Sequence, residues 1–206
     1  MVKVHYFYDP MCGWCYGATA LLETLIASAN IELIYHPGGM INRQTIAASF
    51  KEHILKNDQE IASQTGAVFA APYKARLKNR ENLVFDSYIT TRAILVAEEN
   101  GVTPLIMLKA IQKAHFEQGK QVELLATLEE IAVSFGLHKT RWQAQMQQAE
   151  PKVTEAVQAS HRLMNQYKVQ GYPSLIAETA DGPQHLAHTA YYQNISAWNN
   201  LISTLN

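Results

Sequence analysis

Strand patterns occupy only the two ends of this 206-residue sequence, and helical patterns fill the long stretch between them. Residues 2–8 and 31–36 are rich in β-branched and aromatic side chains, which is typical of strands. The apolar residues that lie between these two segments recur at helical spacing. The first 40 residues therefore predict a βαβ unit, in which the crossover makes the two strands parallel within one sheet.

From about residue 45 to residue 167 the strand pattern is absent and helical periodicity replaces it. Amphipathic helices are expected over residues 46–56, 86–100, 104–118, 123–135, 140–146 and 151–167. The end of the chain returns to β-structure, with a strand over 173–178, a turn at Asp181-Gly182, a weaker strand over 184–188 and a helix over 195–205. We therefore expect an α/β fold in which residues 1–40 and 151–206 form one split domain and residues 41–150 an all-helical insertion.

Charge and hydropathy exclude several classes of partner. The chain has 17 basic and 18 acidic residues, a net charge of -1 and no basic run, which argues against binding to nucleic-acid phosphates. No apolar stretch approaches the roughly 18 residues of a membrane span. The N-terminus has no apolar segment typical of a signal peptide, so we expect a cytoplasmic protein without a membrane partner.

The two cysteines, Cys12 and Cys15, are three residues apart at the predicted start of a helix. A CxxC pair in a reducing compartment is more often catalytic or metal-binding than structural. Free backbone N–H groups and the helix dipole favour a thiolate at Cys12, and residues three apart share one helix face. We therefore predict that Cys12 is the exposed nucleophile and that Cys15, shielded, resolves the mixed disulfide formed on it.

Three other interpretations of the cysteine pair stay open beside redox chemistry. Structural zinc needs four ligands, and the nearest histidine pair, His185 and His188, lacks the usual spacing. A purely structural disulfide and an inert pair of thiols are the other two. We expect no bound metal.

The residues between the cysteines, and Pro173 far along the chain, bear on the expected redox chemistry. Gly13 allows tight backbone geometry, whereas Trp14 offers a large surface but not the positive charge of a histidine, so we expect a mild oxidant. Pro173, in the segment 171–174, either simply begins a strand or forms a cis-proline loop packed against the CxxC.

Four segments resemble the thioredoxin superfamily, and within it the DsbA family of thiol-disulfide oxidoreductases. They are YDPMCGWCYG at 8–17, PGGM at 37–40, the helical segment 85–98 and VQGYPS at 169–174, and the first of them is most similar to the cytoplasmic FrnE-like branch. The resemblance covers essentially the whole chain and implies a thioredoxin-like fold with a large helical insertion. It also implies that Pro173 is cis and that Gly171 and Tyr172 offer backbone to an extended substrate or to glutathione.

The family pattern leaves some positions open. Trp14 stands where the oxidising periplasmic members have histidine. Asp9 and His36 are candidates for a buried charged pair below the cysteines, although a strand-end aspartate and a surface histidine are the simpler interpretation. Met40 is a candidate for substrate binding, because with Phe69, Tyr73 and Phe85 it could line a groove; core packing is the alternative for these four.

The predicted function is thiol-disulfide exchange on protein or glutathione disulfides through a mixed disulfide on Cys12, with no bound cofactor and with glutathione as a redox partner. One alternative is a glutathione-dependent isomerase or transferase of small aromatic substrates, of the hydroxychromene isomerase or kappa-class glutathione transferase type. Those branches usually carry serine in place of Cys12. A second alternative is a chaperone-like binding module that does not use its thiols. The physiological substrate, the direction of electron flow and the oligomeric state stay open.

Overall fold

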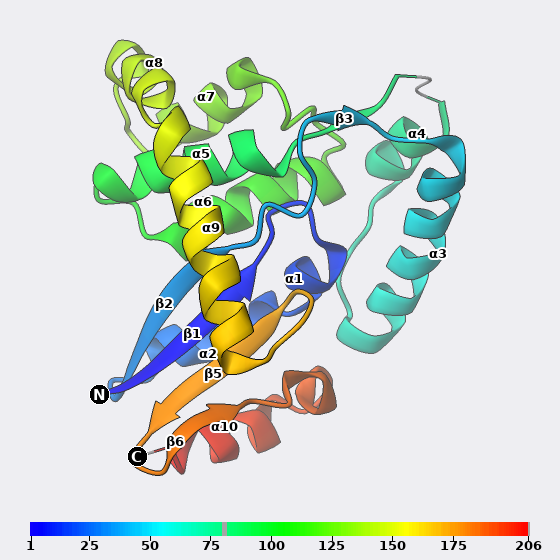
Figure 1. The fold of residues 1–206 in the computed structure, drawn as a ribbon. Coiled ribbons are helices and arrows are strands. Elements are labelled where there is room, and N and C mark those ends of the chain that lie inside the picture. The colour runs from blue at the N-terminus through cyan, green and yellow to red at the C-terminus, as the bar shows by residue number, and fades with distance from the viewer. Residues whose placement is uncertain (80–81, 206) are drawn as a thin grey trace.

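The centre of the computed structural model, which describes residues 1–79 and 82–205, is a four-stranded sheet (Figure 1). Its strands are β1 (Val2–Tyr8), β2 (Ile31–Pro37), β5 (Ser174–Thr179) and β6 (Gly182–His185). The order across the sheet is β2-β1-β5-β6. β1 pairs parallel with β2 and antiparallel with β5, and β6 pairs antiparallel with β5. The parallel pairing predicted for the first two strands is confirmed.

Strand β1 lies inside the sheet and is buried on both faces. Because side chains alternate along a strand, Val4, Tyr6 and Tyr8 enter the main hydrophobic core on one face. Phe7 enters a smaller cluster on the other face with Met164 and Ile176. The residues that follow β1 therefore begin at a point between two packed layers.

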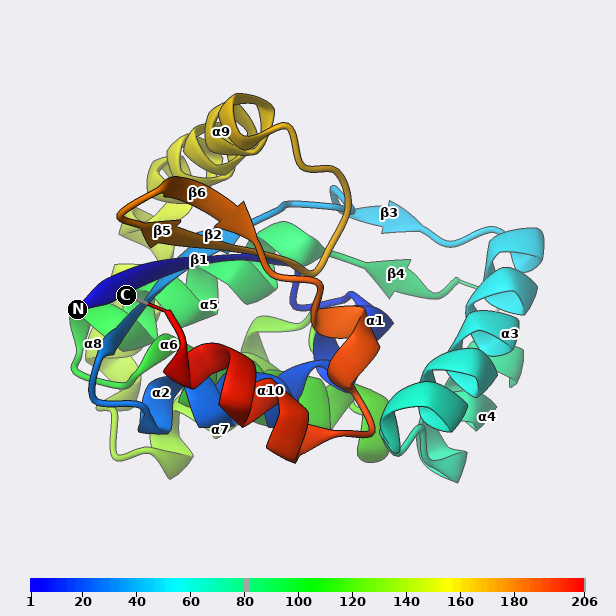
Figure 2. The ribbon, with the colours of Figure 1, turned by 90° about the horizontal axis from the view of Figure 1, so that it is seen from below.

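Helices cover both faces of the sheet (Figure 2). They are α1 (Gly13–Gly17), α2 (Thr19–Ala27), α3 (Ala48–Thr65), α4 (Ala71–Asn79), α5 (Ser87–Glu99), α6 (Pro104–Gln112), α7 (Leu125–Ser134), α8 (Lys139–Gln148), α9 (Glu150–Tyr167) and α10 (Ile195–Ser203). A π-helical turn, Lys113–Glu117, continues α6, and a 3-10 turn, His188–Tyr191, precedes α10. α9 lies on one face, α2 and α10 lie on the other, and α3 and α4 form a pair beyond α1 (Figures 1 and 2).

The segment between β2 and α9 departs from the all-helical prediction at one place. β3 (Gln44–Thr45) and β4 (Val84–Phe85) pair antiparallel. Strands of two residues are too short to show a period-2 pattern, so the sequence did not reveal them. The predicted helix over 46–56 was too short, since the polar run 57–60 concealed the continuation of α3, and α4 was not predicted.

The predicted fold class is confirmed, with sheet strands from both ends of the chain and a large helical insertion between them. The proposed boundaries at residues 40 and 151 stay a prediction. Among the described residues, no helix combines the length and the apolar character that a membrane crossing requires.

Candidate active site

The cysteine pair lies where β1 passes into α1. Strand β1 ends at Tyr8, and Cys12 is the N-cap of α1, in extended conformation. The backbone N–H of Cys15 donates to the Cys12 Sγ over 3.4 Å. A backbone donor aimed at the sulfur stabilises its thiolate form, because hydrogen bonds to the charged form favour that form.

The two thiols, which are not bonded to each other, differ in burial less than the sequence suggested. Cys15 is completely buried, as the prediction of a shielded thiol requires, but Cys12 is only 7% exposed. The prediction of an exposed nucleophile is therefore wrong as stated: Cys12 is accessible through a pocket rather than from the open surface. Burial raises the pKa of the Cys15 thiol, and the neighbouring Cys12 raises it further. A raised pKa favours the neutral form of the Cys15 thiol.

The loop that precedes β5 closes over Cys12. The Tyr172–Pro173 peptide bond is cis, and the Cys12 thiol donates to the Tyr172 carbonyl oxygen over 3.6 Å. Gly171, on the exposed side of this loop, has a positive φ of 80°. The structure therefore brings the segment 171–173 and Cys12 together.

Tyr172 is fixed by close contact with the loop after β2. Its hydroxyl donates to the Gly38 carbonyl oxygen over 3.3 Å. A Cβ on Gly38 would lie 2.2 Å from Cζ of the Tyr172 ring, so only glycine leaves room for the ring there. This contact links the two loops that flank the cysteines.

Asp9 is not an ordinary strand-end aspartate, which corrects the simpler interpretation of the sequence. It is fully buried, and its Oδ1 accepts from the Met11 N–H and the Ser87 hydroxyl while its Oδ2 accepts from the Met40 N–H over 2.6 Å. Its own N–H donates to the Cys15 Sγ over 3.4 Å. Burial raises the pKa of Asp9 to about 6, although these hydrogen bonds oppose the rise.

His36 is the other candidate for a buried charged pair, and it is engaged elsewhere. Its Nε2 lies 2.8 Å from the His5 Nδ1, and the two rings stack. Burial lowers the pKa of His36 to about 4, with the His5 charge acting in the same direction. It is half-buried rather than a surface histidine, and the structure records no hydrogen bond or ion pair between it and Asp9.

Tyr6 is a neighbour of the thiols that sequence reasoning missed. Its side chain is completely buried, and its hydroxyl makes no well-aligned hydrogen bond with any described residue. Burial raises the pKa of Tyr6, and the nearby Cys15 raises it further. The sequence predicts that Tyr6 lies in a strand, but only the tertiary structure places its hydroxyl near Cys15.

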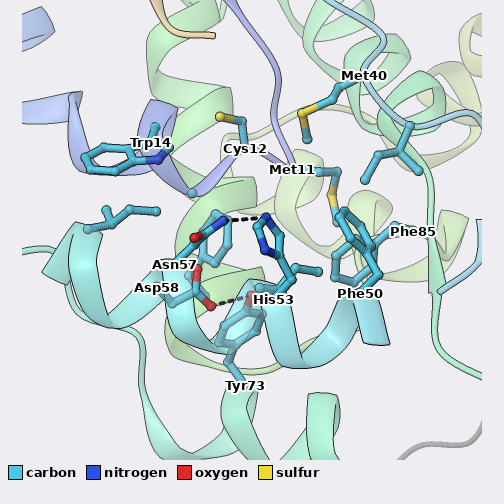
Figure 3. Close-up of a pocket in the computed structure, with 15 residues that line it drawn as sticks. Met11, Cys12, Trp14, Met40, Phe50, His53, Asn57, Asp58, Tyr73 and Phe85 are labelled. Carbon is cyan, nitrogen blue, oxygen red and sulfur yellow. Dashed lines mark hydrogen bonds between the residues drawn. The ribbon is translucent and has the colours of Figure 1, made fainter. Parts of the chain in front are cut away.

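A pocket of about 230 Å³ opens beside Cys12, between α1 and the inserted helices (Figure 3). Trp14 forms part of its wall and stacks on Tyr192 with 6.1 Å between ring centroids. The side chains around the pocket come from distant segments, and most are apolar. The lining residues are Met11, Cys12, Gly13, Trp14, Met40, Ile41, Phe50, His53, Ile54, Asn57, Asp58, Ile61, Tyr73, Phe85 and Phe116.

The groove that the sequence suggested for Met40, Phe69, Tyr73 and Phe85 is only partly formed by these residues. Met40 is 45% exposed at the pocket, and the buried Tyr73 and Phe85 belong to both the core and the pocket wall. Phe69 is buried and does not line the pocket, so core packing is the correct interpretation for it.

Asp58 is the charged residue of this pocket, and the sequence analysis did not identify it. Its Oδ2 accepts a hydrogen bond from the Tyr73 hydroxyl over 3.0 Å (Figure 3). Burial raises the pKa of Asp58 to about 7. A signal was available, because Ile54, Asp58 and Ile61 share one face of a helix. Among the described residues, no group of three or more His, Cys, Asp or Glu side chains is placed to hold a metal ion.

Comparison with known proteins identifies the family to which this fold belongs. The model of the DSBA-like thioredoxin domain family matches residues 3–191. The chain belongs to that family. Members of the DSBA-like family are thiol-disulfide oxidoreductases, and this chain is accordingly an oxidoreductase of that group. No curated protein matched the sequence.

Solved structures extend the family likeness over nearly the whole chain. The cytosolic disulfide reductase DsbM from Pseudomonas aeruginosa is 30% identical, with a TM-score of 0.89 over 98% of this chain and 97% of that one. A second structure of that protein, with glutathione, has the same TM-score and identity over 98% of both chains.

Two more distant structures share the fold. A protein disulfide isomerase candidate from Nitrosomonas europaea is 22% identical, with a TM-score of 0.80 over 98% of this chain and 96% of that one. A 2-hydroxychromene-2-carboxylate isomerase is 13% identical, with a TM-score of 0.60 over 97% of this chain and 95% of that one. At these identities the likeness concerns the fold alone.

Proposed function

We propose that this protein reduces disulfides by dithiol exchange, with Cys12 as nucleophile and Cys15 as resolving thiol. One observation carries the proposal: a fully buried Cys15 lies behind Cys12, whose sulfur faces both a pocket and the carbonyl of Tyr172. A buried neutral thiol beside an accessible one is the arrangement that separates the attacking step from the resolving step.

In the first step the Cys12 thiolate attacks one sulfur of the substrate disulfide, a Cys12–substrate disulfide forms, and the second substrate sulfur leaves as a thiolate that takes up a proton. Formation of the mixed disulfide removes the thiol proton that Cys12 donates to the Tyr172 carbonyl. That carbonyl oxygen is then free to accept an N–H from an extended substrate. Backbone pairing of this kind gives affinity with little dependence on sequence.

In the second step Cys15 loses its proton and attacks Cys12, which breaks the mixed disulfide and releases the reduced substrate. The anion needs donors, because burial disfavours it. The Asp9 N–H already donates to this sulfur. We assign the second donor to the Tyr6 hydroxyl, which is buried close to the thiol and has no other partner among the described residues.

Two molecules of a thiol such as glutathione return the Cys12–Cys15 disulfide to the dithiol and become one disulfide themselves. The structure of DsbM with glutathione supports glutathione as that thiol, and the name of DsbM as a cytosolic disulfide reductase supports both the direction and the cytoplasm as the location. In this cycle the protein needs no bound cofactor.

The test is a pair of serine variants. Cys15→Ser should accumulate a covalent adduct with a protein or glutathione disulfide, detected as added mass that a reductant removes. Cys12→Ser, the matched control, should form no adduct and should lose disulfide reduction. Reduction that survives Cys12→Ser would overturn the proposal, and full function in the double variant would indicate the binding module instead.

A further inference from the structure

The pocket beside Cys12 has a single acidic side chain in an otherwise uncharged wall. None of the residues that line it is lysine or arginine, and Asp58 is the only acidic one. Its side chain is well shielded, since the residue is 3% exposed. A carboxylate in such surroundings is costly unless a cation or several hydrogen bonds accompany it.

Asp58 has fewer hydrogen-bond and ion-pair partners than a buried carboxylate requires. Tyr73 donates to Oδ2, but no described residue donates to Oδ1 and none forms an ion pair with the carboxylate. Oδ1 faces the backbone of α1, where it lies 3.2 Å from the position of a Cβ on Gly13. The unsatisfied oxygen is therefore next to the residue bonded to the nucleophile.

The remaining walls are suited to a cation on a short apolar stem. Five aromatic residues line the pocket, and the faces of such rings attract cations. They are Trp14, Phe50, Tyr73, Phe85 and Phe116. Met11 and Met40 add adaptable apolar surface near the Cys12 sulfur (Figure 3). A volume of about 230 Å³ is below that of pockets for drug-sized ligands, so it fits one small group of a substrate.

We propose that this pocket is a subsite for an ammonium group carried a few bonds from the substrate's disulfide, with the Asp58 carboxylate as its counter-ion. The inference rests on the proposed dithiol function and adds a substrate class to it: disulfides of aminothiols, and proteins that place an amine beside a disulfide. The reaction is the one described above. For cystamine, two thiols are released as cysteamine, and the enzyme dithiol becomes the Cys12–Cys15 disulfide, so the electrons balance without another reductant.

The experiment compares two small disulfides of similar size, cationic cystamine and neutral hydroxyethyl disulfide, with dithiodiglycolate as the anionic member of the series. Prereduced protein is mixed with each disulfide, quenched with acid and alkylated, and its oxidation rate is measured by mass. The measurements are made on the wild type, on Asp58→Asn and on Glu52→Gln, an exposed residue of the same helix outside the pocket. Intrinsic differences in reactivity between the disulfides cancel when each variant is divided by the wild type.

Asp58→Asn should lower the rate constant for cystamine by about 10- to 100-fold, the range of one charge-assisted hydrogen bond, and change that for hydroxyethyl disulfide by less than about twofold. Glu52→Gln should leave both unchanged. Equal effects of Asp58→Asn on the two disulfides would overturn the ammonium site while leaving the dithiol function intact. If no disulfide oxidises the wild-type dithiol, the proposed function itself fails.

The wild type provides a second test that does not depend on a variant's folding. The titratable groups around Asp58 are Tyr73 and Lys74 on α4, His53 on α3, and Cys12. The thiol affects both disulfides alike and cancels in the ratio of the cystamine rate to the hydroxyethyl disulfide rate, so that ratio reports on the charge of the pocket. That ratio should rise with pH through about 7, as Asp58 ionises. A ratio that stays constant between acidic and alkaline pH would contradict the proposal.

Discussion

Replacing Asp58 with asparagine tests the physical state of the buried carboxyl through the stability of the fold. Asparagine has almost the same shape, and its amide oxygen can still accept the hydrogen bond from the Tyr73 hydroxyl. The substitution removes the charge and leaves the close approach to Gly13 in place. Any pH-dependent difference in stability between the two proteins therefore reports on the ionisation of Asp58.

The sign follows from the direction of the pKa shift. The carboxyl titrates near pH 7 in the folded protein and near 3.8 when exposed, so the folded state binds the proton more tightly. The contribution of Asp58 to the free energy of unfolding is therefore largest below pH 3.8 and is lost as the pH rises from there through about 7. The loss amounts to about 1.7 kcal/mol at pH 5 and about 4 kcal/mol at pH 8. The variant, which does not titrate there, should gain about 2.5 kcal/mol on the wild type between those pH values.

The assay is urea unfolding of the reduced proteins at pH 5 and pH 8, with Glu52→Gln as the control for a change of net charge at an exposed position on α3. A gain of about 2.5 kcal/mol corresponds to a relative shift of the midpoint by about 1 M urea. If the stability difference between Asp58→Asn and the wild type is the same at both pH values, the carboxyl is not desolvated and the reasoning is refuted.

Three further substitutions test the surroundings of the thiols. Tyr6→Phe should slow resolution of the mixed disulfide by about 2- to 10-fold, the effect of losing one hydrogen bond. Tyr35→Phe, at a half-buried tyrosine without a cysteine contact, should not slow it, and equal rates of the two variants in rapid-quench experiments would contradict the donor role. Trp14→His should raise the reduction potential of the cysteine pair by about 20–40 mV in a glutathione redox titration, because an imidazolium stabilises the Cys12 thiolate. An unchanged or lower reduction potential would contradict this effect of position 14. Gly38→Ala should displace the Tyr172 ring and lower the free energy of unfolding by about 1–3 kcal/mol. It should also weaken the binding of protein substrates more than that of small disulfides. Unfolding and kinetics equal to those of the wild type would show that the ring has room for the added methyl group.

The sheet and the cysteine pair were predictable because their signals are local. Short segments of strand-type residues bounded by turn residues identified β1, β2 and β5, and the spacing of Cys12 and Cys15 needs only one helical turn. The parallel pairing followed from a rule of chain connection rather than from side chains.

The electrostatics of the site were not predictable in the same way. Asp9 has its low exposure only because the backbone of Met40 and the hydroxyl of Ser87, far along the chain, fold around its carboxyl. Asp58 belongs to the polar run 57–60, which in the sequence looks like a solvated helix face. Ile54 and Ile61 on the same helix face were a signal that this face is covered, but what packs against it is determined by segments outside α3.

The close approach of α3 to α1 explains why the Asp58 carboxylate lies next to the cysteine pair. A Cβ on Gly13 would meet the Ile61 Cδ1 at 2.9 Å as well as Asp58, so α3 approaches α1 as closely as a glycine allows. The contact of Ile61 packs the insertion against α1, and Asp58, one helical turn away, places its Oδ1 at Gly13, the residue that follows Cys12. An insertion that only stabilised the fold would be better served by an apolar residue at position 58. A buried carboxylate that destabilises the folded state at neutral pH is therefore an argument for a cationic ligand.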